Sequence, residues 1–148
     1  MKKLNLKKVQ KTLCATLESI HLNFEYLIKD GSLHALGSLH LKPHDDTIFA
    51  SISFSEHGDG SFIFRFDYLP KTEETLSLVN EFNSIAPLFV AKITTENQLR
   101  LAHEVASITE KQIAEYTMRV FGALVLDSTK NALLPLTKIT ERKEQAAR

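Results

Sequence analysis

Histidines and carboxylates near residues 34–46 form the cluster in this sequence that is best suited to chemistry. His34 and His40 are six residues apart in an alternating stretch, and His44, Asp45 and Asp46 follow directly. Imidazole nitrogens and carboxylate oxygens together bind Zn²⁺ or another divalent ion. However, residues six apart on one continuous strand lie about 20 Å from each other. The cluster therefore needs a bulge in the strand or a second chain before its members share one metal ion.

Other reactive residues have weaker settings. His57 and Asp59 form a second, smaller pair, and Cys14 stands among lysines with no histidine near it in sequence. A structural, half-buried thiol is the favoured interpretation of Cys14. The sequence contains no glycine-rich phosphate loop and no Gly-x-Ser-x-Gly. We therefore expect a chain that is not an enzyme and has no cofactor and no resident metal.

Size and charge bound the class of protein. The chain has 148 residues, enough for a single domain over residues 1–148, and its 18 basic residues balance 18 acidic ones. This balance argues against a nucleic-acid partner. No run of about 18 apolar residues exists, which argues against a membrane partner, and lysines interrupt the leucines at the start of the chain. We expect a cytoplasmic protein whose tail, from Thr140 to Arg148, is frayed.

The alternation of apolar and polar residues between Leu22 and Leu69 predicts four antiparallel strands with one buried face. Asp30-Gly31 marks the first turn, residues 43–46 break the second strand, and residues 57–60 form the third turn. Phe62, Phe64 and Phe66 share a face that lacks interleaved Lys or Arg, so we expect them in the core and not against RNA bases. A further hairpin is expected from Phe89–Thr94 and Leu99–Val105.

Three helices are expected around these strands. Asn5 caps the first, which runs to about Ile20, and Thr72 caps the second, which ends before Pro87. On the second helix Asn83 falls inside the apolar arc and Asn80 lies just past its border. We expect Asn83 and Asn80 to bond to backbone groups as structural polar residues, because an unpaired buried amide costs about 1–3 kcal/mol. The alternative, that the two asparagines face solvent, fits Asn80 better than Asn83.

The last helix starts at a capping box formed by Thr109 and Gln112. Its apolar residues cover well over half of its circumference, which is more than one sheet can bury. Either the helix is sandwiched within the monomer or its spare flank meets a partner. The residues assigned to partner binding are Tyr116, Val120, Phe121, Leu124 and Val125.

These elements predict an α+β fold in the order α-β-β-β-β-α-β-β-α, with about six antiparallel strands and the helices mainly on one face. This order, the segment from Leu78 to Asn83 with its Asn-x-x-Asn, the hairpin from Val90 to Ala102 and the capped helix from Thr109 resemble the YbjN-like proteins, whose fold is shared with type III secretion chaperones. The chain differs from the usual pattern by an extra strand near Phe24–Ile28.

The resemblance implies a dimer without a cofactor that binds other proteins. Our first hypothesis is therefore a non-catalytic, chaperone- or adaptor-like protein-binding module that acts as a homodimer on an unknown protein client. The alternative is a protein that binds a divalent metal or a small ligand, with hydrolytic activity possible, on the polar face of the sheet through His34, His40, His44 and Asp46.

Overall fold

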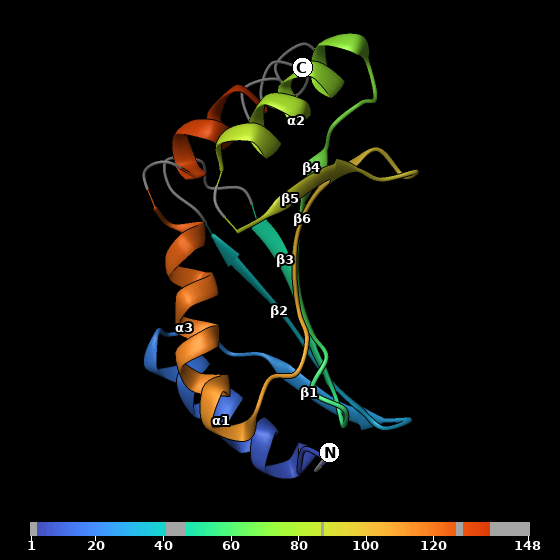
Figure 1. Ribbon diagram of the computed structural model, residues 1–148. Helices are drawn as coiled ribbons and strands as arrows, with labels where there is room; N and C mark the ends of the chain where they lie inside the picture. The colour runs from blue at the N-terminus through green and yellow to red at the C-terminus, as the bar shows by residue number, and fades with distance from the viewer. Residues whose placement is uncertain (1–2, 41–46, 87, 127–128, 137–148) are drawn as a thin grey trace.

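The computed structural model consists of one six-stranded antiparallel sheet with its helices on one side (Figure 1). The structure describes residues 3–40, 47–86, 88–126 and 129–136, without the side chains of Asp67 and Tyr68. The predicted tail segment, Thr140 to Arg148, lies outside these residues. The elements are α1 (Leu6–Ser19), β1 (Glu25–Lys29), β2 (Ser32–His40), β3 (Thr47–Ser55), β4 (Gly60–Tyr68), α2 (Glu73–Ile85), β5 (Val90–Ile93), β6 (Gln98–Val105), a 3₁₀ turn η1 (Glu110–Gln112) and α3 (Ile113–Leu124). Residues 129–136 are also helical.

The strands lie in the order β1-β2-β3-β4-β6-β5, and each neighbouring pair is antiparallel. The first four strands form a meander. The chain then passes through α2 to the far edge, and β6 returns between β5 and β4. The predicted α+β class and element order are therefore confirmed.

Turn residues set the register of the meander. Asp30 and Gly31 both have positive φ, 53° and 73°, which is the backbone geometry of a two-residue hairpin that matches strand twist. Leu33, Ala35 and Leu39 are buried while His34 and His40 are exposed, as the alternation predicts. One slip in this register would exchange the two faces.

The first strand starts later than predicted, at Glu25 and not at Leu22. His21 adopts a positive φ of 63°, and the N–H groups of His21 and Leu22 donate to the carbonyls of Glu18 and Leu17. This pair of bonds is a Schellman end to α1. Leu22 therefore belongs to the helix terminus, because His21 takes the left-handed position that glycine usually occupies.

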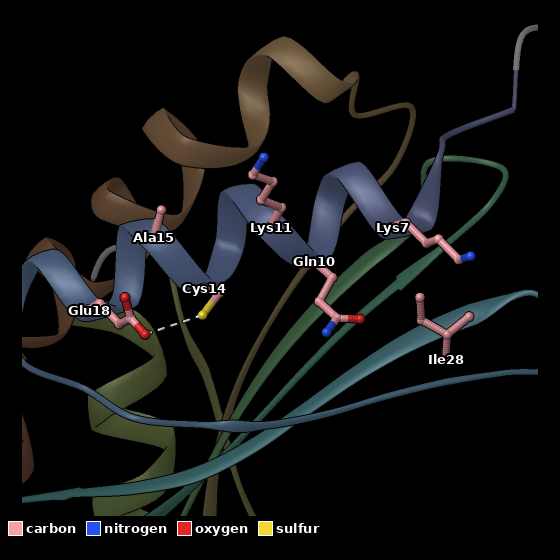
Figure 2. Close-up of a pocket in the computed structure, with 7 residues that line it drawn as sticks. All are labelled: Lys7, Gln10, Lys11, Cys14, Ala15, Glu18 and Ile28. Atoms are coloured by element: carbon pink, nitrogen blue, oxygen red, sulfur yellow. Dashed lines mark hydrogen bonds between the residues drawn. The ribbon is translucent and has the colours of Figure 1, made fainter.

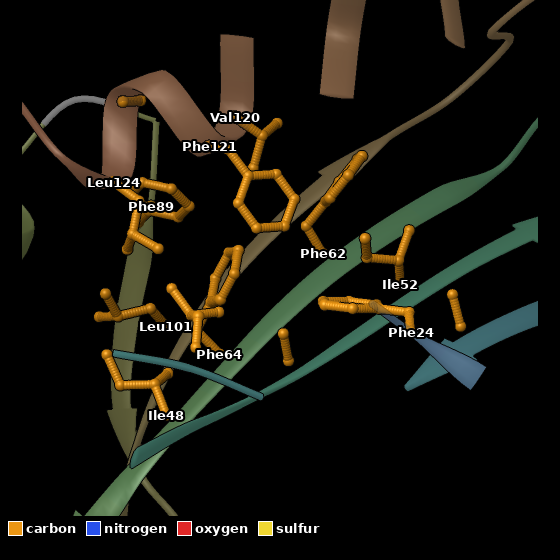
Figure 3. Packing of buried hydrophobic residues seen from close by; sticks show 14 of the residues in the cluster. Phe24, Ile48, Ile52, Phe62, Phe64, Phe89, Leu101, Val120, Phe121 and Leu124 are labelled. Carbon is orange, nitrogen blue, oxygen red and sulfur yellow. The ribbon is translucent and has the colours of Figure 1, made fainter. Parts of the chain in front are cut away.

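The core lies between the sheet and the helical layer (Figure 3). Phe62, Phe64 and Phe66 are buried, as predicted. The ring of Phe64 meets that of Phe121 from α3 edge to face, with centroids 5.5 Å apart, and Phe24 lies 6.5 Å from Phe121. Such pairs add about 0.5–1.5 kcal/mol to the burial of their area.

Phe24 occupies the space above Gly37 on β2. A Cβ built on Gly37 would lie 2.2 Å from the Phe24 ring, closer than any side chain tolerates. Gly122 on α3 is the opposite case, because a Cβ there meets nothing within 4 Å. The first glycine is required by packing, and the second is not.

We predict that Gly37→Ala lowers the free energy of unfolding by about 1–3 kcal/mol, because the Phe24 ring must shift out of a packed core. The matched variant Gly122→Ala should raise it by about 0.5–1 kcal/mol, since alanine costs less backbone entropy in a helix. Urea unfolding of the two variants measures both effects. Equal stability of Gly37→Ala and the parent chain would contradict the packing of Phe24 described above.

Candidate functional site

The sheet has one surface that no described helix covers. In Figure 1, α1, α2 and α3 all lie on the same side of the strands, and the opposite side is open. We call this surface the free face. Leu27, Leu36, Phe49 and Val90 project from it and are between 56% and 64% exposed.

The strand register brings these side chains together. Leu36, Ser51, Ile63, Ala102 and Val90 are successive partners across β2, β3, β4, β6 and β5. Leu27 and Phe49 lie diagonal to Leu36 on the two strands that flank it, within reach of its side chain. The apolar patch is therefore Leu27, Leu36, Phe49, Ile63, Val90 and Ala102.

A shallow hollow accompanies this patch. It has a volume of about 520 Å³ and is lined by Leu36 and Phe49, with Glu25 at one end and Arg65 at the other. Contiguous apolar side chains on an open surface, with charged groups beside them, are typical of a surface that binds another molecule.

The predicted metal cluster is only partly described. His34 and His40 lie on the free face, on one strand, but His34 pairs with Leu27 and Ser53. His44 and Asp46 lie outside the described residues. Within the described part of the chain, no three His, Cys, Asp or Glu side chains are arranged to hold a metal ion.

The weaker pair lies in the β3–β4 turn. The backbone N–H groups of His57 and Asp59 both donate to the Ser55 hydroxyl, at 3.3 and 3.2 Å. Gly58, between them, has a positive φ of 91°. These contacts account for the turn itself and indicate no chemistry for the two side chains.

Cys14 lines a hollow of about 640 Å³ between α1 and β1 (Figure 2). Its thiol is half-buried and donates to the Glu18 carboxylate over 3.5 Å. No histidine is among the described residues that line this hollow. On the neighbouring strand, burial raises the pKa of Tyr26, and Cys14 and Glu18 raise it further. The structure therefore gives Cys14 the half-buried setting that the sequence predicts.

The prediction that the last helix offers a broad apolar flank to a partner is wrong for most of its residues. Val120 and Leu124 are 0% exposed and Phe121 is 6% exposed, all within their own chain. The sheet covers one side of α3, where Phe64 meets Phe121, and α1 packs beside the helix, so two neighbours share the broad apolar surface (Figure 1). Tyr116 is half-buried, whereas Val125 is 51% exposed.

Sequence reasoning missed the internal role of Tyr116. Its hydroxyl is hydrogen-bonded to Nε2 of His103 on β6, and Nδ1 of His103 lies 2.9 Å from the carbonyl of Leu88. A carbonyl only accepts, so Nδ1 carries a proton, and in the neutral ring Nε2 accepts from the tyrosine. This chain of bonds ties α3 to the loop before β5, where Leu88 has a positive φ of 78°. The sequence did contain a signal for this role, because His103 takes an inward position on its strand, between Leu101 and Val105.

The prediction for Asn83 is confirmed in its bonding. Its Nδ2 donates to the Ala91 carbonyl at 3.0 Å, and its Oδ1 accepts from the Ala91 N–H at 2.6 Å. The residue itself is exposed, although its bonds are part-buried. Because β5 is an edge strand, Asn83 occupies backbone groups that would otherwise pair with another strand. Asn80 is exposed on the same helix.

No protein-family model, no curated protein and no solved structure matches this chain. The resemblance to YbjN-like proteins and secretion chaperones stays a prediction. Among the described helices, none is long and apolar enough to cross a membrane.

We predict that Asn83→Ala lowers the free energy of unfolding by about 1 kcal/mol or more, since both backbone groups of Ala91 lose a partner. Asn80→Ala, on the same helix, should change it by less than about 0.5 kcal/mol. Urea unfolding compares the two, and hydrogen exchange at the Ala91 amide reports the lost bond directly. An Ala91 amide that stays equally protected in Asn83→Ala would rule out this clamp.

Proposed function

We propose that this chain is a non-catalytic protein-binding module, chaperone- or adaptor-like, that acts as a homodimer. The observation that supports it best is the apolar patch on the free face. Monomeric proteins rarely leave side chains such as Leu36 and Phe49 exposed side by side at the centre of a sheet, because each exposed apolar side chain forgoes about 1.5–3 kcal/mol of burial.

The arrangement of the patch favours a macromolecular partner over a small molecule. It extends across the register from β1 at one edge of the sheet to β5 at the other. The hollow beside Phe49 is shallow and faces outward, whereas small-molecule sites enclose most of their ligand. A flat apolar surface of this kind fits a protein segment.

A second, smaller apolar surface supports homodimer formation. Met118 on α3 and Val125, the C-cap of that helix, are about two turns apart and are 43% and 51% exposed. Leu126, the next residue, is 50% exposed. This flank replaces the one predicted from the sequence and keeps only Val125 from it. It belongs to the helical layer, so a second copy bound there leaves the free face open to a client.

The binding role of the free face is tested by a photoreactive phenylalanine analogue at position 49, introduced in cells that express the chain. We expect covalent adducts with other proteins, because Phe49 is 59% exposed within the patch. The matched control is position 85, where Ile85 is 57% exposed on α2. Leu36→Glu should remove the adducts made from position 49. Equal adducts from both positions, or none from position 49, would reject the free face as the binding surface.

The dimer is tested by Val125→Glu, measured by light scattering on a size-exclusion column at micromolar concentration. We expect a dimer for the parent chain and a folded monomer for the variant, since a buried, unpaired carboxylate disfavours the interface. Ser77→Glu, at an exposed position of α2, is the control and should remain dimeric. A monomeric parent chain, or a Val125→Glu variant that still dimerises, would refute pairing through this flank.

A further inference from the structure

Three cationic side chains stand in a line on the free face. Arg65 on β4, Arg100 on β6 and Lys92 on β5 are direct partners in the sheet register, and Phe49 on β3 continues the same line. Arg65 and Lys92 are exposed and Arg100 is partly exposed. We call these three residues the cationic row. Neighbouring strands are about 4.8 Å apart, so the row spans about 10 Å.

Within the chain this row is electrostatically unfavourable. Like charges directly opposite each other on adjacent strands destabilise a sheet. Arg119 and Glu115, both on α3, form a salt bridge that lies away from the free face and includes no member of the cationic row. The described acidic side chains that the strands place on the free face are Glu25 and Glu104, and both lie on other lines of the register. A negatively charged partner would relieve this repulsion.

The apolar patch lies directly beside the cationic row. Ile63, Ala102 and Val90 are each two residues from a member of the row, on the same strand and the same face. That step is about 7 Å. A partner that covers the patch therefore meets the cations along one of its sides, so it must be apolar in the middle and acidic at one edge.

We propose that the free face binds an acidic amphipathic segment of a partner protein, with its carboxylates on Arg65, Arg100 and Lys92 and its apolar side chains on the patch. This proposal rests on the proposed protein-binding function and names the chemistry of the partner. Acidic residues three and four apart on a helix are about 5–6 Å from each other, close to the spacing of the cationic row. An amphipathic helix with one acidic border therefore fits the free face.

The composition of the face favours a protein segment over a nucleic acid. Sheets that bind single strands combine several stacking aromatics with an extended basic groove. Among the described residues, Phe49 is the one aromatic side chain that is exposed on this face. Glu104, on the same face of β6 but four residues from Arg100, would repel a phosphate backbone, and the chain as a whole has a formal net charge of zero.

The test uses a fluorescent helical peptide of about 18 residues, with leucines along one stripe and glutamates along its border. Fluorescence anisotropy with the full chain should show binding that weakens as salt is raised, because exposed charge pairs are screened. A peptide with glutamine at each glutamate should bind less tightly. Replacing all three cations by glutamine should weaken binding of the acidic peptide about tenfold.

Two controls keep the outcome clear. Lys8→Gln removes an exposed lysine on α1, away from the free face, and should leave the affinity unchanged. Thermal melting separates binding from folding, because removal of facing like charges should leave the melting temperature unchanged or higher. If the triple variant fails to fold, Lys92→Gln alone should weaken binding severalfold. Melting temperatures that fall in step with affinity would assign the row a structural role and overturn the proposal.

The remaining outcomes each decide the question. Equal affinity of the triple variant and the parent chain, or no binding of the acidic peptide, overturns the proposal. If the parent chain binds polyuridylate more tightly than the acidic peptide, and the triple variant loses that binding, the proposal is overturned in favour of a nucleic-acid partner. Failure of the peptide together with protein adducts from position 49 would reject the acidic partner while leaving the protein-binding function standing. Failure of both would reject the two proposals together.

Discussion

The one-sided burial of the antiparallel sheet is the constraint on which the rest of this structure depends. Strict alternation along β2, β3 and β4 directs Leu33, Ile52, Phe62 and Phe64 toward the helices. Since successive side chains on a strand point to opposite faces, the residues between them must face the other way. The helical layer is built on the first face, and every feature proposed to be functional lies on the second or on the outer surface of the helices.

The helical layer is held by a small number of large contacts. Phe121 of α3 meets Phe64 of the sheet, and Phe24, which follows α1, fills the space above Gly37. α1 lies beside α3, so the two helices cover the sheet together (Figure 1). This arrangement explains why α3 is apolar over so much of its circumference without offering all of that surface to a partner.

The β5 edge of the sheet is secured by side-chain bonds and not by a further strand. Asn83 pairs with both backbone groups of Ala91, and His103 binds the Leu88 carbonyl while it is bonded to Tyr116. These bonds hold the short β5 strand in place at the edge. At Ala91, the bonds to Asn83 occupy backbone groups with which another strand could otherwise pair.

Periodicity in the amino-acid order was sufficient to predict the class, the element order, the turn at Asp30-Gly31 and the bonding of Asn83, because each depends on neighbours within about ten positions or on a local turn. The late start of β1 was not predicted, because His21 adopts a positive φ, a backbone geometry that glycine usually occupies. Periodicity also could not predict three features that involve distant segments: the neighbours of α3, the His103–Tyr116 bond, and the alignment of Arg65, Arg100 and Lys92. Those features depend on which strands become adjacent and in which register, and that is set by the packing of segments far apart in the chain.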